Sequence, residues 1–247
     1  MLDELVRLAL AETSPTIRQA LLAQIALITS KFLASRDVHY STDILVRLSA
    51  DIAVEGPMSE ASIRVIFWTA RGLILRLADT EQVLEHLLAL LPNAKYGLSA
   101  ARGFGILLGP DEIISKDNGC NIRLLAKQKA FHICVPHIAR DFRSAETTAK
   151  TNYLIALSGI IKYIPTEVLM PYLDTLLPLL LQSLDLQDAE VKAATIETLT
   201  VVSQESPAAV EDHISSLVNR LLKAAADPKT NVAVSFLGLL FATQNRC

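Results

Sequence analysis

Residues 171–184 read PYLDTLLPLLLQSL, a stretch whose apolar positions return at a nearly fixed distance before and after it. Leu173 corresponds to Ile214, 41 positions later, and to Phe131, 42 positions earlier. The later match continues along the segment and pairs Leu176, Leu177, Leu180 and Leu181 with Leu217, Val218, Leu221 and Leu222. A repeat of about 40 residues built from helical segments is typical of stacked helix pairs.

The rest of the chain extends this pattern. Apolar residues recur at helical spacing in about twelve segments separated by short polar stretches, and strand-like alternation is absent. Most second helices open with a small or β-branched residue followed by a cation: Ile17-Arg18, Ile63-Arg64, Ala149-Lys150 and Val191-Lys192. The period and this dyad resemble the HEAT repeat, whose helix pairs stack into a solenoid. The sequence therefore predicts an all-α fold, a right-handed α-solenoid of about six HEAT-like helix pairs, as one continuous array over residues 1–247.

Composition supports a helical array. Hydrophobic residues make up 51% of the 247 positions, and only 5% are aromatic, so the core must be built from aliphatic side chains. The longest uncharged run, residues 230–245, is shorter than the ~20 apolar residues of a membrane span. Three cysteines are too few for a disulfide framework and suit a reducing compartment. A net charge of −3 argues against bulk nucleic-acid binding.

The stretch FHICVPH raises the question of a metal site, because His132, Cys134 and His137 lie close together. At about 100° per residue, His132 and Cys134 lie about 160° apart around one helix and cannot share an ion. Cys134 also occupies the register of Leu176, a core position, so we expect a small buried hydrophobe. No metal or other cofactor is predicted.

No other pattern indicates catalysis. The chain has no Gly-rich phosphate loop and no HExxH, GxSxG or CxxC motif. Cys120 follows the polar loop DNGC, where we expect it to be exposed, and has no nearby histidine. The glycines of ARGFGILLG indicate close helix packing, and the dyad cations are interpreted as internal ion pairs, for example Lys192 with Asp188. The sequence predicts a protein that is not an enzyme.

One local charge asymmetry remains. Residues 121–150 hold six cations against two carboxylates. Lys129, Ile133 and Arg140 fall opposite the predicted buried stripe of their helix, so they should face solvent. This region is the best candidate for contact with an acidic partner.

From residue 101 onward the sequence resembles a particular HEAT-repeat family. The motifs are RLLAKQKAF at 123–131, NYL-x-x-LS at 152–158 and P-x-x-VL-x-P at 165–171, followed by the leucine run. They resemble the C-terminal region of the methyl-methanesulfonate-sensitivity (nineteen) scaffold of the cytosolic iron–sulfur assembly targeting complex. Residues 1–100 resemble it only weakly. Because the chain stops at TQNRC inside an apolar helix, we expect a C-terminal fragment of a larger scaffold or a shortened variant.

The resemblance implies a non-catalytic scaffold of the cytoplasm and nucleus. Its C-terminal repeats would dock a small acidic assembly factor and the WD-repeat propeller that pairs with it. These would deliver clusters to iron–sulfur apoproteins such as helicases, polymerases and primase, without direct contact to nucleic acid or membrane. The basic region then suggests the partner-binding residues, with the two isoleucines as exposed anchors: Lys129, Ile133, Arg140, Arg143, Ile155 and Lys162.

An uncapped last helix should also expose Phe236, Leu240 and Phe241 and allow self-association through the C-terminal end. Two other classes remain open. A HEAT-type transport or phosphatase scaffold would equally lack catalytic motifs. A HEAT-like DNA glycosylase would need a basic groove containing an aromatic residue and a carboxylate, which an acidic chain with one tryptophan disfavours.

Overall fold

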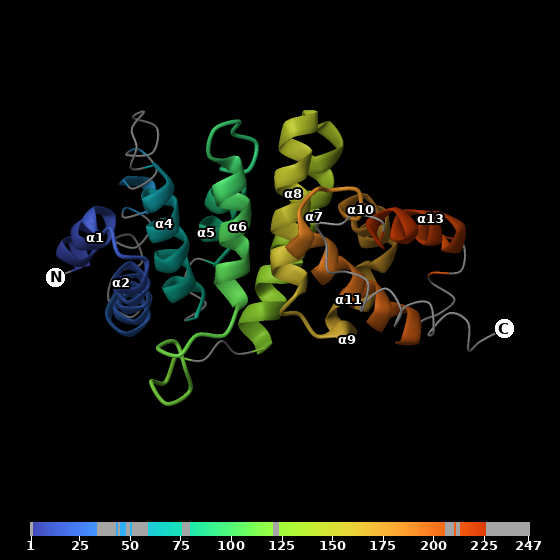
Figure 1. Cartoon of the computed structure of the whole chain (residues 1–247). Coiled ribbons are helices and arrows are strands. Elements are labelled where there is room, and N and C mark those ends of the chain that lie inside the picture. Colours follow the sequence, from blue (N-terminus) through green and yellow to red (C-terminus); the bar gives the residue numbers. More distant parts are fainter. Residues whose placement is uncertain are drawn as a thin grey trace.

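Antiparallel helices follow one another along the described part of the chain in a computed structural model (Figure 1). The structure describes residues 2–33, 43, 45–47, 50, 59–75, 80–120, 124–205, 210 and 213–225. Within these ranges every regular element is a helix and no strand occurs. The predicted all-α solenoid is confirmed. The expected C-terminal patch of Phe236, Leu240 and Phe241 lies outside the described residues.

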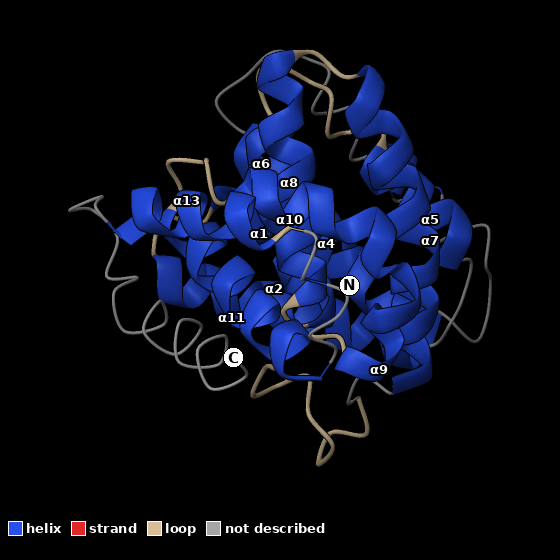
Figure 2. Ribbon diagram, turned by 90° about the vertical axis from the view of Figure 1, so that its right-hand side faces the viewer, coloured by secondary structure: helices blue, strands red, loops and turns tan. Residues whose placement is uncertain are grey.

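The helices form two rows, and Figure 2 shows two members of the first row, α5 and α7, to one side of α6 and α8 of the second. First helices are α1 (Leu2–Ala11), α5 (Thr80–Leu88), α7 (Leu124–Ser144), α10 (Leu173–Ser183) and α13 (Ile214–Ala225). Second helices are α2 (Pro15–Ile28), α4 (Ser59–Ile74), α6 (Gly97–Leu108), α8 (Thr147–Ile161) and α11 (Ala189–Glu205). The π-helical turn η1 (Thr29–Leu33) extends α2, while α9 (Thr166–Leu169) and the 3-10 turn η2 (Met170–Tyr172) lead into α10.

Contacts within each row make the stack continuous. In the second row α2 packs on α4, α4 on α6, α6 on α8 and α8 on α11. In the first row α5 packs on α7, α7 on α10, and α10 on α13. Four pairs are described with both members, whereas α4 and α13 are each described alone, so the predicted six pairs include residues outside the described ranges.

The repeat seen in the sequence is the repeat of the core. Leu173, Leu176, Leu177 and Leu180 are buried in α10, and their counterparts Phe131, Cys134, Val135 and Ile138 are buried in α7. Leu217 and Leu221 hold the same positions in α13. The same stripe is thus buried in α7, α10 and α13, and burial of such leucines contributes about 1.5–3 kcal/mol each.

The most extensive helix contact in the described part of the chain lies between α6 and α8. A Cβ added to Gly159 would lie 2.7 Å from the backbone nitrogen of Gly105, so the two backbones are in direct contact. On the nearly opposite face of α6, toward α4, Gly103 faces the buried ring of Phe67, which itself meets Phe104 edge to face with centroids 5.3 Å apart. The prediction that these glycines serve close helix packing is confirmed.

The loop of residues 109–120, after α6, folds back onto earlier repeats. Arg71 of α4 is only 2% exposed, lies over the ring of Trp68 and donates from Nη2 to the carbonyl oxygen of Gly109 at 2.6 Å. Burial lowers the pKa of this guanidinium. At the other end of the loop, Cys120 Sγ lies 3.8 Å from Ser30 Oγ in η1. The expectation that Cys120 is exposed is therefore wrong, because the loop covers it against η1.

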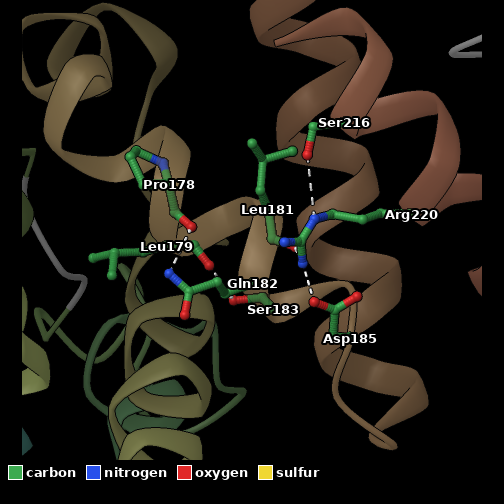
Figure 3. Close-up of polar contacts among 8 residues, drawn as sticks. All are labelled: Pro178, Leu179, Leu181, Gln182, Ser183, Asp185, Ser216 and Arg220. Carbon is green, nitrogen blue, oxygen red and sulfur yellow. Dashed lines mark hydrogen bonds and ion pairs between the residues drawn. The ribbon is translucent and has the colours of Figure 1, made fainter.

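At the other end of the described chain, Arg220 fastens α13 to α10 (Figure 3). Its Nη1 donates to the carbonyl oxygen of Leu181 at 3.0 Å and also contacts the carboxylate of Asp185. Its Nε donates to Ser216 Oγ at 3.4 Å within α13. One partly buried guanidinium thus donates to both a backbone carbonyl and a carboxylate at the end of the neighbouring first helix.

Candidate functional site

Three of the predicted partner-binding cations share one face of α7. Lys129, Arg140 and Arg143 are exposed there, on the side away from the buried stripe, and we call them the basic face of α7. Arg140 Nε donates to Asp141 Oδ1 at 2.7 Å, and its Nη2 lies 3.2 Å from His137 Nδ1. The hydrogen bond that Arg140 donates to Asp141 raises the pKa of Arg140, which therefore stays charged.

His132 and Cys134 of the FHICVPH stretch lie in different surroundings, one exposed and one in the core. Cys134 is buried in the core, where burial raises the pKa of its thiol. His132 is exposed, and its Nδ1 lies 2.6 Å from the hydroxyl of Tyr172 in η2. Tyr172 also meets Phe131 edge to face, with centroids 5.3 Å apart. The interpretation of Cys134 as a core residue is confirmed, and the described residues contain no group of three or more side chains placed to hold a metal.

The two isoleucines expected to act as exposed anchors do not stand out from the surface. Ile133 is half-buried and packs against the core. Ile155 of α8 is only 6% exposed, so the expectation that it is an exposed anchor is wrong. The reason is lateral packing, because α8 has α6 on one side, α11 on the other and α7 behind it.

Lys162 belongs to a different surface from the basic face of α7. It follows the last residue of α8 and lines a hollow of about 280 Å³ between α6, α8 and α11. The same lysine lines an adjoining hollow of about 470 Å³ along α11, together with Glu190 and Glu197. We call these joined hollows the α8–α11 groove. The structure thus brings Lys129, Arg140 and Arg143 together and places Lys162 in the second row.

Charged side chains meet across this groove. Arg102 of α6 lies 3.8 Å from Asp188, and Lys162 lies 3.9 Å from Glu190. Asp188 also caps α11, because its Oδ1 accepts the backbone N–H groups of Glu190 and Val191 at 3.0 and 3.1 Å. Neither Arg102 nor Lys162 belongs to a dyad; among the dyad cations, Lys150 lies over the ring of Phe142 rather than in the internal ion pair that was expected.

Sequence reasoning did not single out the groove residues Arg102, Glu190 and Glu197. Arg102 lies in the helix that lacks the dyad, so comparing the repeats gave no reason to choose it. Glu190 and Glu197 are seven positions apart and share one face of α11, which was the available signal. That spacing alone could not show that the cations Arg102 and Lys162 lie on the other side of the groove.

Comparison with known proteins decides the family. Residues 1–242 match the family described as RNAPII transcription regulator C-terminal. The chain belongs to the MMS19 family. The match extends over residues 1–100 as well, where the sequence motifs gave only weak similarity.

MMS19 relatives come from distant eukaryotes. The MMS19 nucleotide excision repair protein homolog of Bos taurus is 27% identical over 98% of this chain and 24% of its own length. The Xenopus laevis homolog is 32% identical over 76% of this chain and 19% of its own length. The DNA repair/transcription protein mms19 of Schizosaccharomyces pombe is 26% identical over 97% and 24%, respectively. The chain therefore spans about a quarter or less of the length of these curated MMS19 relatives.

Solved structures agree on the architecture. A designed armadillo repeat protein superposes with a TM-score of 0.51 at 16% identity, covering 98% of this chain and 99% of its own. An engineered protein gives a TM-score of 0.52 at 19% identity, covering 99% and 98%. At this identity the likeness shows the fold alone, a helical repeat solenoid for this MMS19 family member. None of its described helices combines the length and the apolar character that a membrane span requires.

Proposed function

We propose that this chain is the docking part of a non-catalytic scaffold in cytosolic iron–sulfur protein assembly, working in cytoplasm and nucleus. It would hold an acidic assembly factor and the WD-repeat propeller paired with it. These would deliver clusters to apoproteins of DNA metabolism, namely helicases, polymerases and primase. The family supports this role, since its curated relatives are named for DNA repair and transcription. A stack of helix pairs also offers long surfaces suited to several partners at once.

The observation that carries the proposal is the basic face of α7. Lys129, Arg140 and Arg143 lie exposed along one side of a helix of 21 residues. Their positive potential would steer an acidic protein toward this face and increase its association rate. The ion pair of Arg140 with Asp141 is exposed, so exchanging it for a partner's carboxylate costs little. We therefore restrict the docking surface to this face, with half-buried Ile133 beneath it.

The test is binding of the purified acidic assembly factor to the full chain by calorimetry at two salt concentrations. We expect the double variant Lys129→Glu/Arg140→Glu to weaken binding by about 1–3 kcal/mol if both side chains are interfacial. A matched variant, Arg7→Glu/Lys223→Glu, reverses two exposed charges on α1 and α13 and should bind normally. The assignment is wrong if the first variant binds normally at low salt while the second loses docking.

The alternative functions predict different binding partners. Affinity purification of the full chain from a cell extract should recover the assembly factor and the propeller. Recovery of transport cargo or of phosphatase subunits in their place would favour one of the other scaffold classes. DNA binding with a steep dependence on salt would instead favour direct nucleic-acid recognition.

A further inference from the structure

The α8–α11 groove exists because two neighbouring helix contacts differ. α8 packs far more extensively on α6 than on α11. On the α6 side, Gly159 and Gly105 allow backbone contact. The same two glycines and Ala194 of α11 also line the groove, beside the bulkier Ile106, Ile155 and Tyr163, and we call these three small residues its floor. A floor of this kind lets another main chain approach closely.

The groove has walls of opposite charge. Arg102 and Lys162 stand on the α6 and α8 side, and their side chains are 66% and 44% exposed. Glu190 and Glu197 stand on α11, where Glu190 is 87% exposed. Basic side chains therefore line one side and acidic side chains the other.

The bridges across the groove can open at little cost. The pairs Arg102–Asp188 and Lys162–Glu190 are 3.8 and 3.9 Å long, which is longer than a hydrogen bond, and both reach solvent. Exposed ion pairs of this length contribute little to stability. After opening, Asp188 keeps its two backbone N–H donors, so its carboxylate is not left unsatisfied.

We propose that the α8–α11 groove binds an extended peptide segment whose charges alternate in sign from residue to residue. Successive side chains of an extended chain point to opposite sides. Strict alternation therefore directs every acidic side chain toward Arg102 and Lys162 and every basic one toward Glu190 and Glu197. The peptide backbone lies over the small-residue floor. This site goes beyond the proposed docking function, because it lies in the second row of helices rather than on α7.

The test uses two fluorescein-labelled peptides of equal composition, (Glu-Lys)4 and (Glu-Glu-Lys-Lys)2, and the full chain. In the second peptide each side of the extended chain carries both signs. Fluorescence anisotropy at low salt should show that the alternating peptide binds at least about tenfold more tightly. The proposal is wrong if the block-ordered peptide, (Glu)8 or (Lys)8 binds as tightly as (Glu-Lys)4.

Variants of the four wall residues provide a second test. Because all four side chains lie on the surface, we expect the variants to fold, and circular dichroism can verify this. Arg102→Glu/Lys162→Glu makes both walls acidic and should abolish the preference for alternation. Adding Glu190→Lys/Glu197→Lys makes the α11 wall basic except for Asp188, which stays on its two backbone N–H donors, and should restore the preference, since the peptide can bind in the opposite direction. Retention of the preference in the first variant, or its absence in the exchanged one, would overturn the proposal.

The outcome is independent of the docking function. Lys129→Glu/Arg140→Glu should leave binding of (Glu-Lys)4 unchanged, and the wall variants should leave binding of the assembly factor unchanged. If the wall variants lose the assembly factor as well, the groove and the basic face of α7 are one site and the inference of a second one is wrong.

Discussion

Two glycines that touch each other should respond in opposite ways to the same substitution. A methyl group on Gly159 would lie 2.7 Å from the backbone nitrogen of Gly105 and 3.1 Å from its Cα. Backbone atoms in a helix cannot move away by a rotamer change. A methyl group on Gly105 would find nothing nearer than 3.8 Å, an ordinary contact distance. Gly105→Ala is therefore the matched control for Gly159→Ala.

The magnitudes follow from two effects. Replacing glycine by alanine inside a helix stabilises it by about 1 kcal/mol. At Gly159 the contact must also widen from 2.7 to about 3.4 Å, which pushes α6 and α8 apart, and overpacking of this kind costs about 1–3 kcal/mol. We expect Gly159→Ala to lower the free energy of unfolding by up to about 2 kcal/mol and Gly105→Ala to raise it by up to about 1 kcal/mol.

Urea unfolding of the full chain, followed by far-UV circular dichroism, measures both changes. Thermal midpoints should differ in the same sense, by roughly 2–4 °C for each kcal/mol at this chain length. Equal midpoints for the two variants, or a lower one for Gly105→Ala, would show that α6 and α8 do not meet through these glycines.

Three further expectations are simpler to test. Arg220→Ala should release α13 from α10 at a cost of about 1–2 kcal/mol, seen as about tenfold faster amide exchange confined to α13; unchanged exchange would argue against the contact. Cys120 and Cys134 are both buried, so a thiol reagent followed by mass spectrometry should label neither until denaturant is added; rapid labelling of Cys120 would contradict its burial. Burial lowers the pKa of His86, so the unfolded chain takes up the proton first and stability falls as pH drops below about 6.5. His86→Gln should lose less stability between pH 7.5 and 5.5 than the unmodified chain does, and an equal loss would refute this.

The buried residues of the first helices could be predicted because the apolar pattern that specifies them lies within one helix and recurs in the next repeat. Leu176 and Leu177 recur as Cys134 and Val135, and all four are buried in equivalent positions. Lys129 and Arg140 could be placed on a solvated face for the same reason, since they lie opposite that stripe. Family motifs then added what periodicity could not supply, namely a candidate role.

Lateral neighbours could not be predicted from a single helix. Ile155 looked outward on its own helix, yet α6 and α11 cover it from both sides. Cys120 sits in a polar stretch whose composition suggests exposure, but the loop runs back to Ser30, 90 residues earlier. Arg102 and Glu190 approach one groove from helices of different repeats. In each case, burial or contact depends on the distance between two neighbouring repeats. The spacing of side chains within one repeat carries no information about that distance.

The loop of residues 109–120 changes how the first part of the chain acquires its structure. In a simple stack each pair contacts only the next, and folding can start anywhere and propagate. Here the loop after the third pair touches Ser30 at the end of the first, while Arg71 of the second bonds to the start of the loop. Three pairs therefore become one cooperative folding unit. At 5–20 residues per second, a ribosome needs roughly 5–18 s to reach Cys120 after Ser30. During that interval α2 can already pack on α4, but the contact between Ser30 and the loop is still missing, so the first pair reaches its final surroundings only after the third pair has been made.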